Sequence, residues 1–245
     1  ATLSMVGSMT SDDWIKGKYG SALDLDGSDD QLTTGLLDND NLDMGTSSFT
    51  ISMWLIRDTA TTMDGIMHKR LEGYGTTCAS SNNTGYQLVI YDTDELSVSI
   101  CDGTNGWEMY ANNPITTGVW THVSAVVDRS NLSNSRLYLN GVPLSDTKIN
   151  DGSNPPITGN ISNTNPYEIG NSGGGGGLDN TDPYDGKLDD VRVYKYARTK
   201  QQVIEDMNAG HPAGGSPIGS QTIYWQFDDM RGTTANNKVS GGTNG

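Results

Sequence analysis

The chain has few of the residues from which many catalytic and metal sites are built. Its 245 residues include two cysteines, three histidines and five glutamates. No Cys/His metal spacing and no Ser/His/Asp order stands out among them. Basic residues are also scarce, with 15 Lys and Arg against 30 Asp and Glu and a net charge of −15. Because proteins hold nucleic acids through their phosphates, this charge argues against a nucleic-acid-binding protein.

Long apolar stretches are absent as well. No run approaches the roughly 20 apolar residues that a membrane helix needs, so we expect no membrane insertion. The sequence given begins at Ala1, with neither an initiator methionine nor an apolar signal region. This beginning suits a processed, exported chain, and we therefore expect an extracellular or cell-surface location.

Turn-forming residues dominate the remainder, and they favour an all-β protein of many short strands. Twenty-five aspartates outnumber the glutamates fivefold. Aspartate suits tight turns, and its short carboxylate also suits calcium bound by oxygen ligands. The composition leaves both interpretations open for any single aspartate.

Several segments show the alternating pattern of half-buried strands, and one shows the pattern of a helix. Thr199 followed by Gln202 forms the sequence signature of a helix cap, so we predict one short helix there. The predicted strands include one around Ala22–Leu25 and the segments Ser48–Arg57, Gly65–Leu71, Tyr86–Tyr91, Leu96–Cys101, Val119–Asp128, Arg136–Val142, Pro166–Gly170 and Tyr184–Ala197.

The last apolar strand has an unusual position. Thr222–Asp229 places Ile223, Trp225 and Phe227 on one face, but it follows a Gly/Pro-rich linker and comes almost last. Such a strand requires a sheet to enter. Burying its three apolar side chains would contribute up to roughly 10 kcal/mol, so leaving it unpaired would be costly.

The two cysteines lie beside one predicted hairpin. Cys101 ends its second strand, and Cys78 lies in the loop before its first strand. A disulfide between them is feasible, but so is a pair of free thiols, because sequence does not fix the geometry.

Five motifs in register resemble a known family, the laminin-G-like and concanavalin A-like jelly rolls. They are Gly17–Asp30 (GKYGSALDLDGSDD), Phe49–Trp54 (FTISMW), Trp120–Val126 (WTHVSAV), Leu137–Gly141 (LYLNG) and Tyr184–Tyr194 (YDGKLDDVRVY). The resemblance implies two antiparallel sheets packed face to face as a β-sandwich, with residues 1–207 as the jelly roll. It further implies a frequent calcium ion, a binding surface on the loops or a sheet face, and usually no catalysis.

The resemblance also makes the last strand a displaced one. In the family, a strand like Trp225–Asp229 normally comes first, before the Gly-Lys-Tyr-Gly motif. Here residues 208–221 form a linker, and residues 222–245 complete either a neighbouring jelly roll or their own. We favour donation to a neighbour, which predicts a head-to-tail filament or repeat array whose partner is another copy of the chain.

A calcium site is the chemistry that the resemblance implies. Carried over onto this sequence, its candidate ligands are Asp26, Asp189, Asp190 and Asp228, with the carbonyl of Gly27 as a further oxygen donor. Calcium at Asp228 would lock the last strand to its acceptor sheet.

We expect no enzyme, because the Glu-x-Asp-x-Glu pattern of glycosidases with a similar fold does not occur. The main hypothesis is therefore a non-catalytic structural or adhesive module. The alternative is a calcium-dependent, lectin-like module that binds carbohydrate. Tyr74, Trp107 and Tyr110 are the candidate sugar-binding aromatics, since they lie in loop-rich stretches of the sequence.

Overall fold

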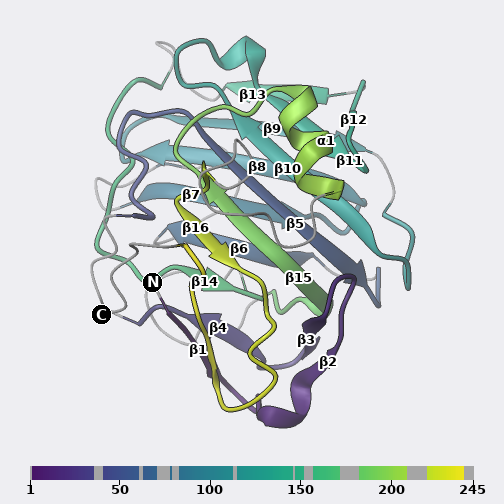
Figure 1. Ribbon diagram of the computed structural model, residues 1–245. Coiled ribbons are helices and arrows are strands. Elements are labelled where there is room, and N and C mark those ends of the chain that lie inside the picture. Colours follow the sequence, from purple (N-terminus) through teal and green to yellow (C-terminus); the bar gives the residue numbers. More distant parts are fainter. Residues whose placement is uncertain are drawn as a thin grey trace.

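The chain folds into two antiparallel β-sheets that pack face to face, with one helix on the outer side (Figure 1). This computed structural model describes residues 2–35, 41–60, 63–70, 78, 83–112, 115–145, 147–151, 157–171, 182–208 and 220–239. The predicted all-β sandwich with one short helix is confirmed. No helix within these ranges is long and apolar enough to cross a membrane.

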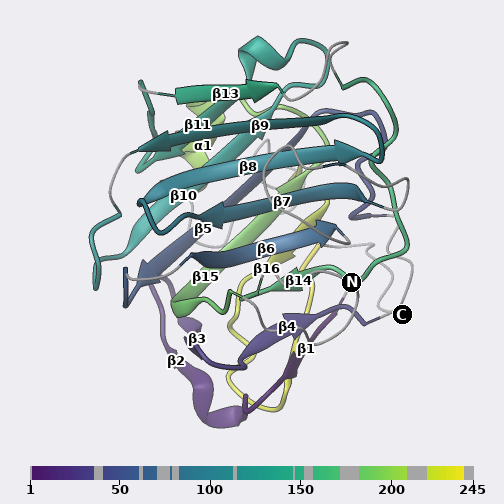
Figure 2. The same ribbon diagram turned by 180° about the vertical axis from the view of Figure 1, so that it is seen from behind.

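Nine strands form the sheet that faces the viewer in Figure 2. In spatial order they are β13 (Thr147–Asp151), β9 (Gly106–Asn112), β8 (Glu95–Asp102), β7 (Thr84–Ile90), β6 (Asp64–Arg70), β14 (Glu168–Ile169), β4 (Gln31–Thr33), β1 (Leu3–Val6) and β17 (Thr234–Ala235).

Eight strands form the other sheet. Their order is β12 (Val142–Pro143), β11 (Arg136–Leu139), β10 (Thr121–Val127), β5 (Phe49–Arg57), β15 (Asp185–Tyr194), β3 (Ser21–Asp26) and β2 (Trp14–Lys16), with β16 (Ile223–Trp225) also paired to β15. Two short 3₁₀ helices, η1 (Ser11–Asp13) and η2 (Leu132–Asn134), lie in the connections.

The α-helix found among the described residues lies on the outer face of the eight-stranded sheet (Figure 1). It is α1 (Lys200–Asn208), and it begins at the predicted cap, where Thr199 N donates to Gln202 Oε1 and Gln202 N donates to Thr199 Oγ1. Val203 packs against Val126 and Tyr138 of the sheet below. The capping-box pattern therefore located this helix correctly.

Alternating side chains fill the space between the sheets. The inward residues of β5 (Phe49, Ile51, Met53 and Leu55) are fully buried, and they join one continuous core with inward residues of β6 to β9. The alternation expected from the sequence is thus the alternation that builds the core.

The last strand lies in the sheet of its own chain. β16 pairs antiparallel with β15, with Val191 opposite Trp225, and the two strands run side by side in Figure 1. Ile223, Trp225 and Phe227 are all fully buried in the chain's own core, where the Trp225 ring stacks on Tyr167 at 5.5 Å.

Of the two arrangements that the sequence left open, the chain has the self-closed one, and closing a loop within a chain costs little entropy. Donation of the strand to a neighbouring copy stays a prediction. The strand is also shorter than we predicted, because Phe227 has a φ of +54° and leaves the extended conformation. Its side chain nevertheless reaches the core.

A disulfide joins Cys78 to Cys101, with the two Cα atoms 5.8 Å apart. It attaches the chain at Cys78 to the end of β8. Of the two possibilities that the sequence left open, the structure has the bonded one.

Candidate functional site

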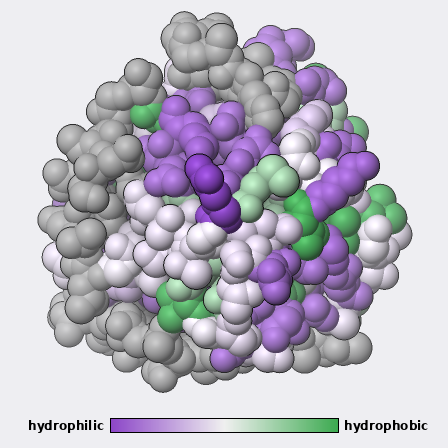
Figure 3. All heavy atoms as spheres, turned by 60° about the horizontal axis from the view of Figure 1, so that its bottom comes forward, coloured by the Kyte–Doolittle hydropathy of each residue, from purple (hydrophilic) through white to green (hydrophobic). Residues whose placement is uncertain are grey.

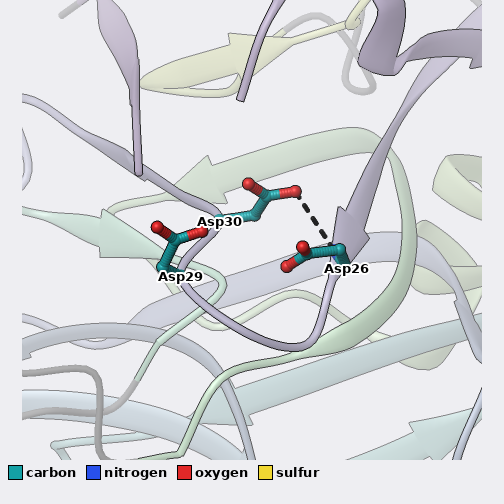
Figure 4. Close-up of side chains that lie close together, drawn as sticks. All are labelled: Asp26, Asp29 and Asp30. Atoms are coloured by element: carbon teal, nitrogen blue, oxygen red, sulfur yellow. Dashed lines mark hydrogen bonds between the residues drawn. The ribbon is translucent and has the colours of Figure 1, made fainter. Parts of the chain in front are cut away.

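An acidic turn joins the two sheets at one edge of the sandwich. The turn follows β3 in the eight-stranded sheet and leads into β4 in the nine-stranded sheet. Asp26, Asp29 and Asp30 each offer a carboxylate oxygen there, and these oxygens lie within 4.8 Å of one another (Figure 4). Gly27 turns the chain at a φ of +69°, and a Cβ at this position would lie 2.6 Å from Cβ of Asp185. The turn therefore requires a glycine.

Hydrogen bonds fix the three carboxylates. Ser8, in the connection after β1, donates from its hydroxyl to Asp29 (2.6 Å) and Asp30 (2.9 Å), while the Asp26 amide donates to Asp30. Asp26 accepts from the Ser28 amide. Burial raises the pKa of Asp30. Three carboxylates and nearby carbonyls form the all-oxygen donor set that suits calcium, so the chemistry of this turn fits the ion.

The other predicted calcium ligands lie elsewhere. Asp189, Asp190 and Asp228 gather around the turn from Gly17 to Gly20, whereas Asp26 lies at the opposite end of β3. The structure therefore does not bring the predicted set of ligands together. Asp26 and Gly27 belong to one group, and the remaining three belong to another.

The second group is already engaged by protein donors. Asp190 accepts from the Tyr224 hydroxyl (2.5 Å) and from Arg192 Nη2 (3.2 Å), and Asp228 Oδ1 accepts from the Ser21 amide (2.7 Å). The Arg192 guanidinium would also repel a cation. This group consequently does not fit calcium, and its carboxylates serve to hold the Gly17–Gly20 turn and β16.

Asp189 differs from its neighbours because one of its oxygens has no partner. Oδ2 accepts from the Tyr19 amide (2.9 Å), but Oδ1 is buried without a hydrogen bond. Burial, followed by the negative charge of Asp190, raises the pKa of Asp189 to about 8. The neutral acid is therefore the stable form at neutral pH.

A second candidate site is a row of polar residues on the outer face of the nine-stranded sheet. Residues that are directly paired across strands share a face. The pairing joins Thr234, Ser4, Thr33, Glu168, His68, Gln87, Ser99 and Glu108, one from each of eight neighbouring strands. We call this set the polar row.

The polar row is hydrogen-bonded to its surroundings at the β7–β9 end. Glu108 Oε1 accepts from the hydroxyls of Tyr91 and Ser97, each at 2.6 Å, and Arg70 Nη1 donates to Ser99. Glu108 is itself buried, so the row here is a hydrogen-bonded layer beside the half-buried Tyr91.

The three predicted sugar-binding aromatics have different outcomes. Tyr74 lies outside the described residues. Trp107 is wrong as a surface residue, because it is 1% exposed and belongs to the core, facing inward from β9. Tyr110 is half-buried and shares the outward face with Glu108, two residues away on β9. We missed β9 as a strand, and this error placed Trp107 in a loop.

The polar row carries two carboxylates, but they are far apart. Glu108 and Glu168 are separated by four strand-to-strand steps, which is about 19 Å across the sheet. Glycosidases place their two carboxylates roughly 5–10 Å apart. This pair therefore does not form the acid/base arrangement of glycoside hydrolysis.

The polar row itself was not recognised from the sequence. The alternation Leu96-Ser97-Val98-Ser99-Ile100 indicates a strand with a polar outer face, and that signal was available. The alignment of these polar residues across strands depends on register, which no single strand reveals.

Comparison with known proteins shows which family and which solved structures this chain is similar to. Residues 26–204 match a family described as the concanavalin A-like lectin/glucanases superfamily. A protein from Bacteroides ovatus that is considered to bind carbohydrate has a similar structure, with a TM-score of 0.53 at 23% identity. The match covers 80% of this chain and 50% of that one, so this chain spans about half the length of that relative. No curated protein matches the sequence.

Two further structures share the fold at 14% identity. One is the carbohydrate-binding module CBM40 of the Ruminococcus gnavus IT-sialidase, bound to α2,3 sialyllactose (TM-score 0.53, covering 77% of this chain and 96% of that one). The other is the enzymatically active domain of tailspike protein 2 from bacteriophage CBA120 (TM-score 0.57, covering 92% and 33%). At such identities the likeness shows the fold alone.

Proposed function

Since the chain belongs to the concanavalin A-like lectin/glucanase superfamily, we propose that it binds carbohydrate on the outer face of its nine-stranded sheet, without catalysis. The observation that carries this proposal is the unbroken polar row. Eight consecutive strands each present a polar residue at one level of the sheet.

The β7–β9 end of the row supplies the chemistry that a sugar needs. Sugars are bound by hydrogen-bonding groups beside aromatic rings. Tyr91 and Tyr110 are half-buried there, and the Tyr91 hydroxyl donates to the buried Glu108. Glu168 and His68, further along the row, are buried and paired with each other at 2.8 Å. We therefore place the sugar over β8 and β9.

Distant structural relatives include proteins associated with carbohydrate binding, which supports the proposal. The pairing of the last strand within its own sheet favours the lectin-like hypothesis over the filament. We propose a monomeric, extracellular module. The Cys78–Cys101 disulfide supports this location, since disulfides persist in oxidising compartments.

A glycan-array screen of the full chain, followed by calorimetric titration of the strongest hit, tests the proposal. Tyr110→Ala and Glu108→Gln should each weaken binding by about tenfold or more, equivalent to a loss of about 1.4 kcal/mol. Val119→Ala is the matched control, because Val119 is 50% exposed and lies outside the row. A chain that binds no glycan, or row variants that bind like the unaltered protein, would refute it.

We also propose that calcium binds at the acidic turn and stabilises the fold. Asp26, Asp29 and Asp30 would hold the ion, with the Gly27 carbonyl as a further ligand. Ser8 already ties two connections between the sheets together at this point. An ion here would neutralise three crowded carboxylates and thereby strengthen that link.

Thermal unfolding with added calcium or with a chelator tests this second proposal. Calcium should raise the melting temperature of the unaltered chain, and Asp29→Asn should reduce that rise. Asp228→Asn is the comparison, because it removes a carboxylate from the group that does not fit the ion. An equal calcium response in all three proteins would place the ion elsewhere, and no response would exclude it.

A further inference from the structure

The outer face of the eight-stranded sheet contains a second polar region, unrelated to the polar row. Two neighbouring levels of β10, β5 and β15 form it: His122, Trp54 and Asp189 are paired across the strands at one level, and Ser124, Ser52 and Arg192 at the next. These six Cα atoms occupy an area of about 10 Å by 7 Å. We call the six residues the buried polar patch.

The Gly17–Gly20 turn, called the strap from here on, and helix α1 lie over this patch. The Gly17–Gly20 strap places Lys18 Nζ 4.2 Å from the centre of the Trp54 ring, and the Tyr19 amide donates to Asp189. The Tyr19 hydroxyl donates to the carbonyl of Met207 in α1, and Arg192 Nη1 donates to the carbonyl of Asp206. Trp54 is 6% exposed and the other five residues are fully buried.

The patch concentrates unpaired polar atoms. Across the described part of the chain, 12 buried side-chain atoms have no hydrogen-bond partner, and five of them belong to this patch. They are Trp54 Nε1, His122 Nδ1, Ser124 Oγ, Asp189 Oδ1 and Arg192 Nε. A buried polar atom without a partner costs roughly 1–3 kcal/mol, so five such atoms in one small area require a common explanation.

Their chemistry is complementary. Trp54 Nε1 and Arg192 Nε can only donate. The neutral Asp189 carboxyl and the Ser124 hydroxyl can each donate or accept. His122 is neutral, because burial lowers its pKa to about 3, so its Nδ1 can either donate or accept. A molecule with two donor hydrogens and two acceptor lone pairs suits this set.

We propose that the buried polar patch binds internal water, which bridges the sheet to the strap. An internal water molecule makes about three hydrogen bonds to otherwise unpaired groups, and the patch offers five. The register of β15 against β5 shifts between Asp189 and Arg192, so the ladder is irregular at this point of the patch. Water bound here ties the Gly17–Gly20 strap to the three central strands.

Water-selective NOE and ROE spectra of the ¹⁵N-labelled full chain test the proposal directly. The indole N–H of Trp54, identified by its loss in Trp54→Phe, should show a cross-peak to long-lived water with the sign of a slowly tumbling pair. Trp14 is the matched control, since its Nε1 already donates to the Gly232 carbonyl at 3.0 Å. A protected Trp54 indole without such a cross-peak would overturn the proposal.

The stability of Trp54→Phe gives an independent answer. The phenylalanine retains an aromatic ring but removes the N–H. If water bridges the indole, this change should lower the folding equilibrium constant by about fivefold or more, because a hydrogen bond is lost. Because Trp54→Phe also removes ring volume and so loses packing, Ser124→Ala, which deletes only a hydroxyl, gives the cleaner comparison. A Ser124→Ala chain that is as stable as the unaltered protein, or more stable, would overturn the proposal.

Discussion

Replacing Asp189 with asparagine should abolish a specific part of the protein's pH dependence. Asp189 is fully buried, and its folded-state pKa of about 8 exceeds its ordinary value of 3.8. Between these two values the folded state holds a proton that the unfolded state has released. The stability associated with this proton is therefore present at low pH and is lost as the pH rises toward 8.

The size of the effect follows from that difference. One proton corresponds to about 1.4 kcal/mol per pH unit. Between pH 5 and pH 8 the unaltered chain should therefore lose up to about 4 kcal/mol that Asp189→Asn retains. The asparagine side-chain oxygen can still accept the hydrogen bond that the Tyr19 amide donates to Asp189 at 2.9 Å. Its amide group can donate toward the neighbouring carboxylates.

Urea unfolding at pH 5, 6, 7 and 8 measures this prediction. The advantage of Asp189→Asn over the unaltered chain should grow steadily across the series and level off above pH 8. Asp92→Asn, which changes an exposed turn residue, controls for the loss of one charge and should show a constant difference. If Asp189→Asn runs parallel to the unaltered chain at every pH, the argument from a buried neutral acid is refuted.

Three further predictions concern how the fold is held together. Trp225→Ala should lower the free energy of unfolding by about 3–5 kcal/mol in urea titrations, because the fully buried ring would leave a cavity. Replacing Cys78 and Cys101 together by serine should lower the free energy of unfolding by about 3 kcal/mol in the same assay. The disulfide links two residues that are separated by 23 positions in the sequence, and it therefore restricts the unfolded chain. The full chain should elute as a monomer at all concentrations in size-exclusion chromatography, and a truncation after Gln221 should aggregate or unfold; a concentration-dependent series of oligomers would instead restore strand donation.

Much of the fold could be predicted from local pattern. β5, β10 and β15 follow strands that alternation identified, and α1 begins at its predicted cap. β9 escaped notice because Gly106, Glu108 and Asn112 make its sequence look like a loop, and only pairing with β8 and β13 makes it a strand. Strand preference depends on neighbours in this way more than helix preference does.

The candidate site was harder to predict than the fold. Asp26 and Gly27 were correctly placed in an acidic turn, but their companions Asp29 and Asp30 were not among the predicted ligands. The sequence resemblance instead grouped Asp26 with residues at the far end of β3. Strand register separates them, because Asp26 pairs with Asp185 while Asp189 lies four residues further along β15.

The exposed surface gives little additional guidance. Figure 3 shows small separate hydrophobic patches among hydrophilic residues on one face, and the large exposed apolar residues of the described ranges are Val119, Val142 and Met230. Scattered residues of this kind are normal on soluble domains and do not indicate an interface. The proposal of carbohydrate binding therefore rests on the nine-stranded sheet and not on an exposed apolar patch.

The most direct test of carbohydrate binding on the nine-stranded sheet is an NMR titration with the strongest glycan from the array. The account predicts that backbone amide shifts change in β7, β8 and β9, centred on Ser97, Glu108 and Tyr110, and that amides of β10 and β15 stay unchanged. Shifts confined to the eight-stranded sheet or to the Asp26–Asp30 turn would contradict it.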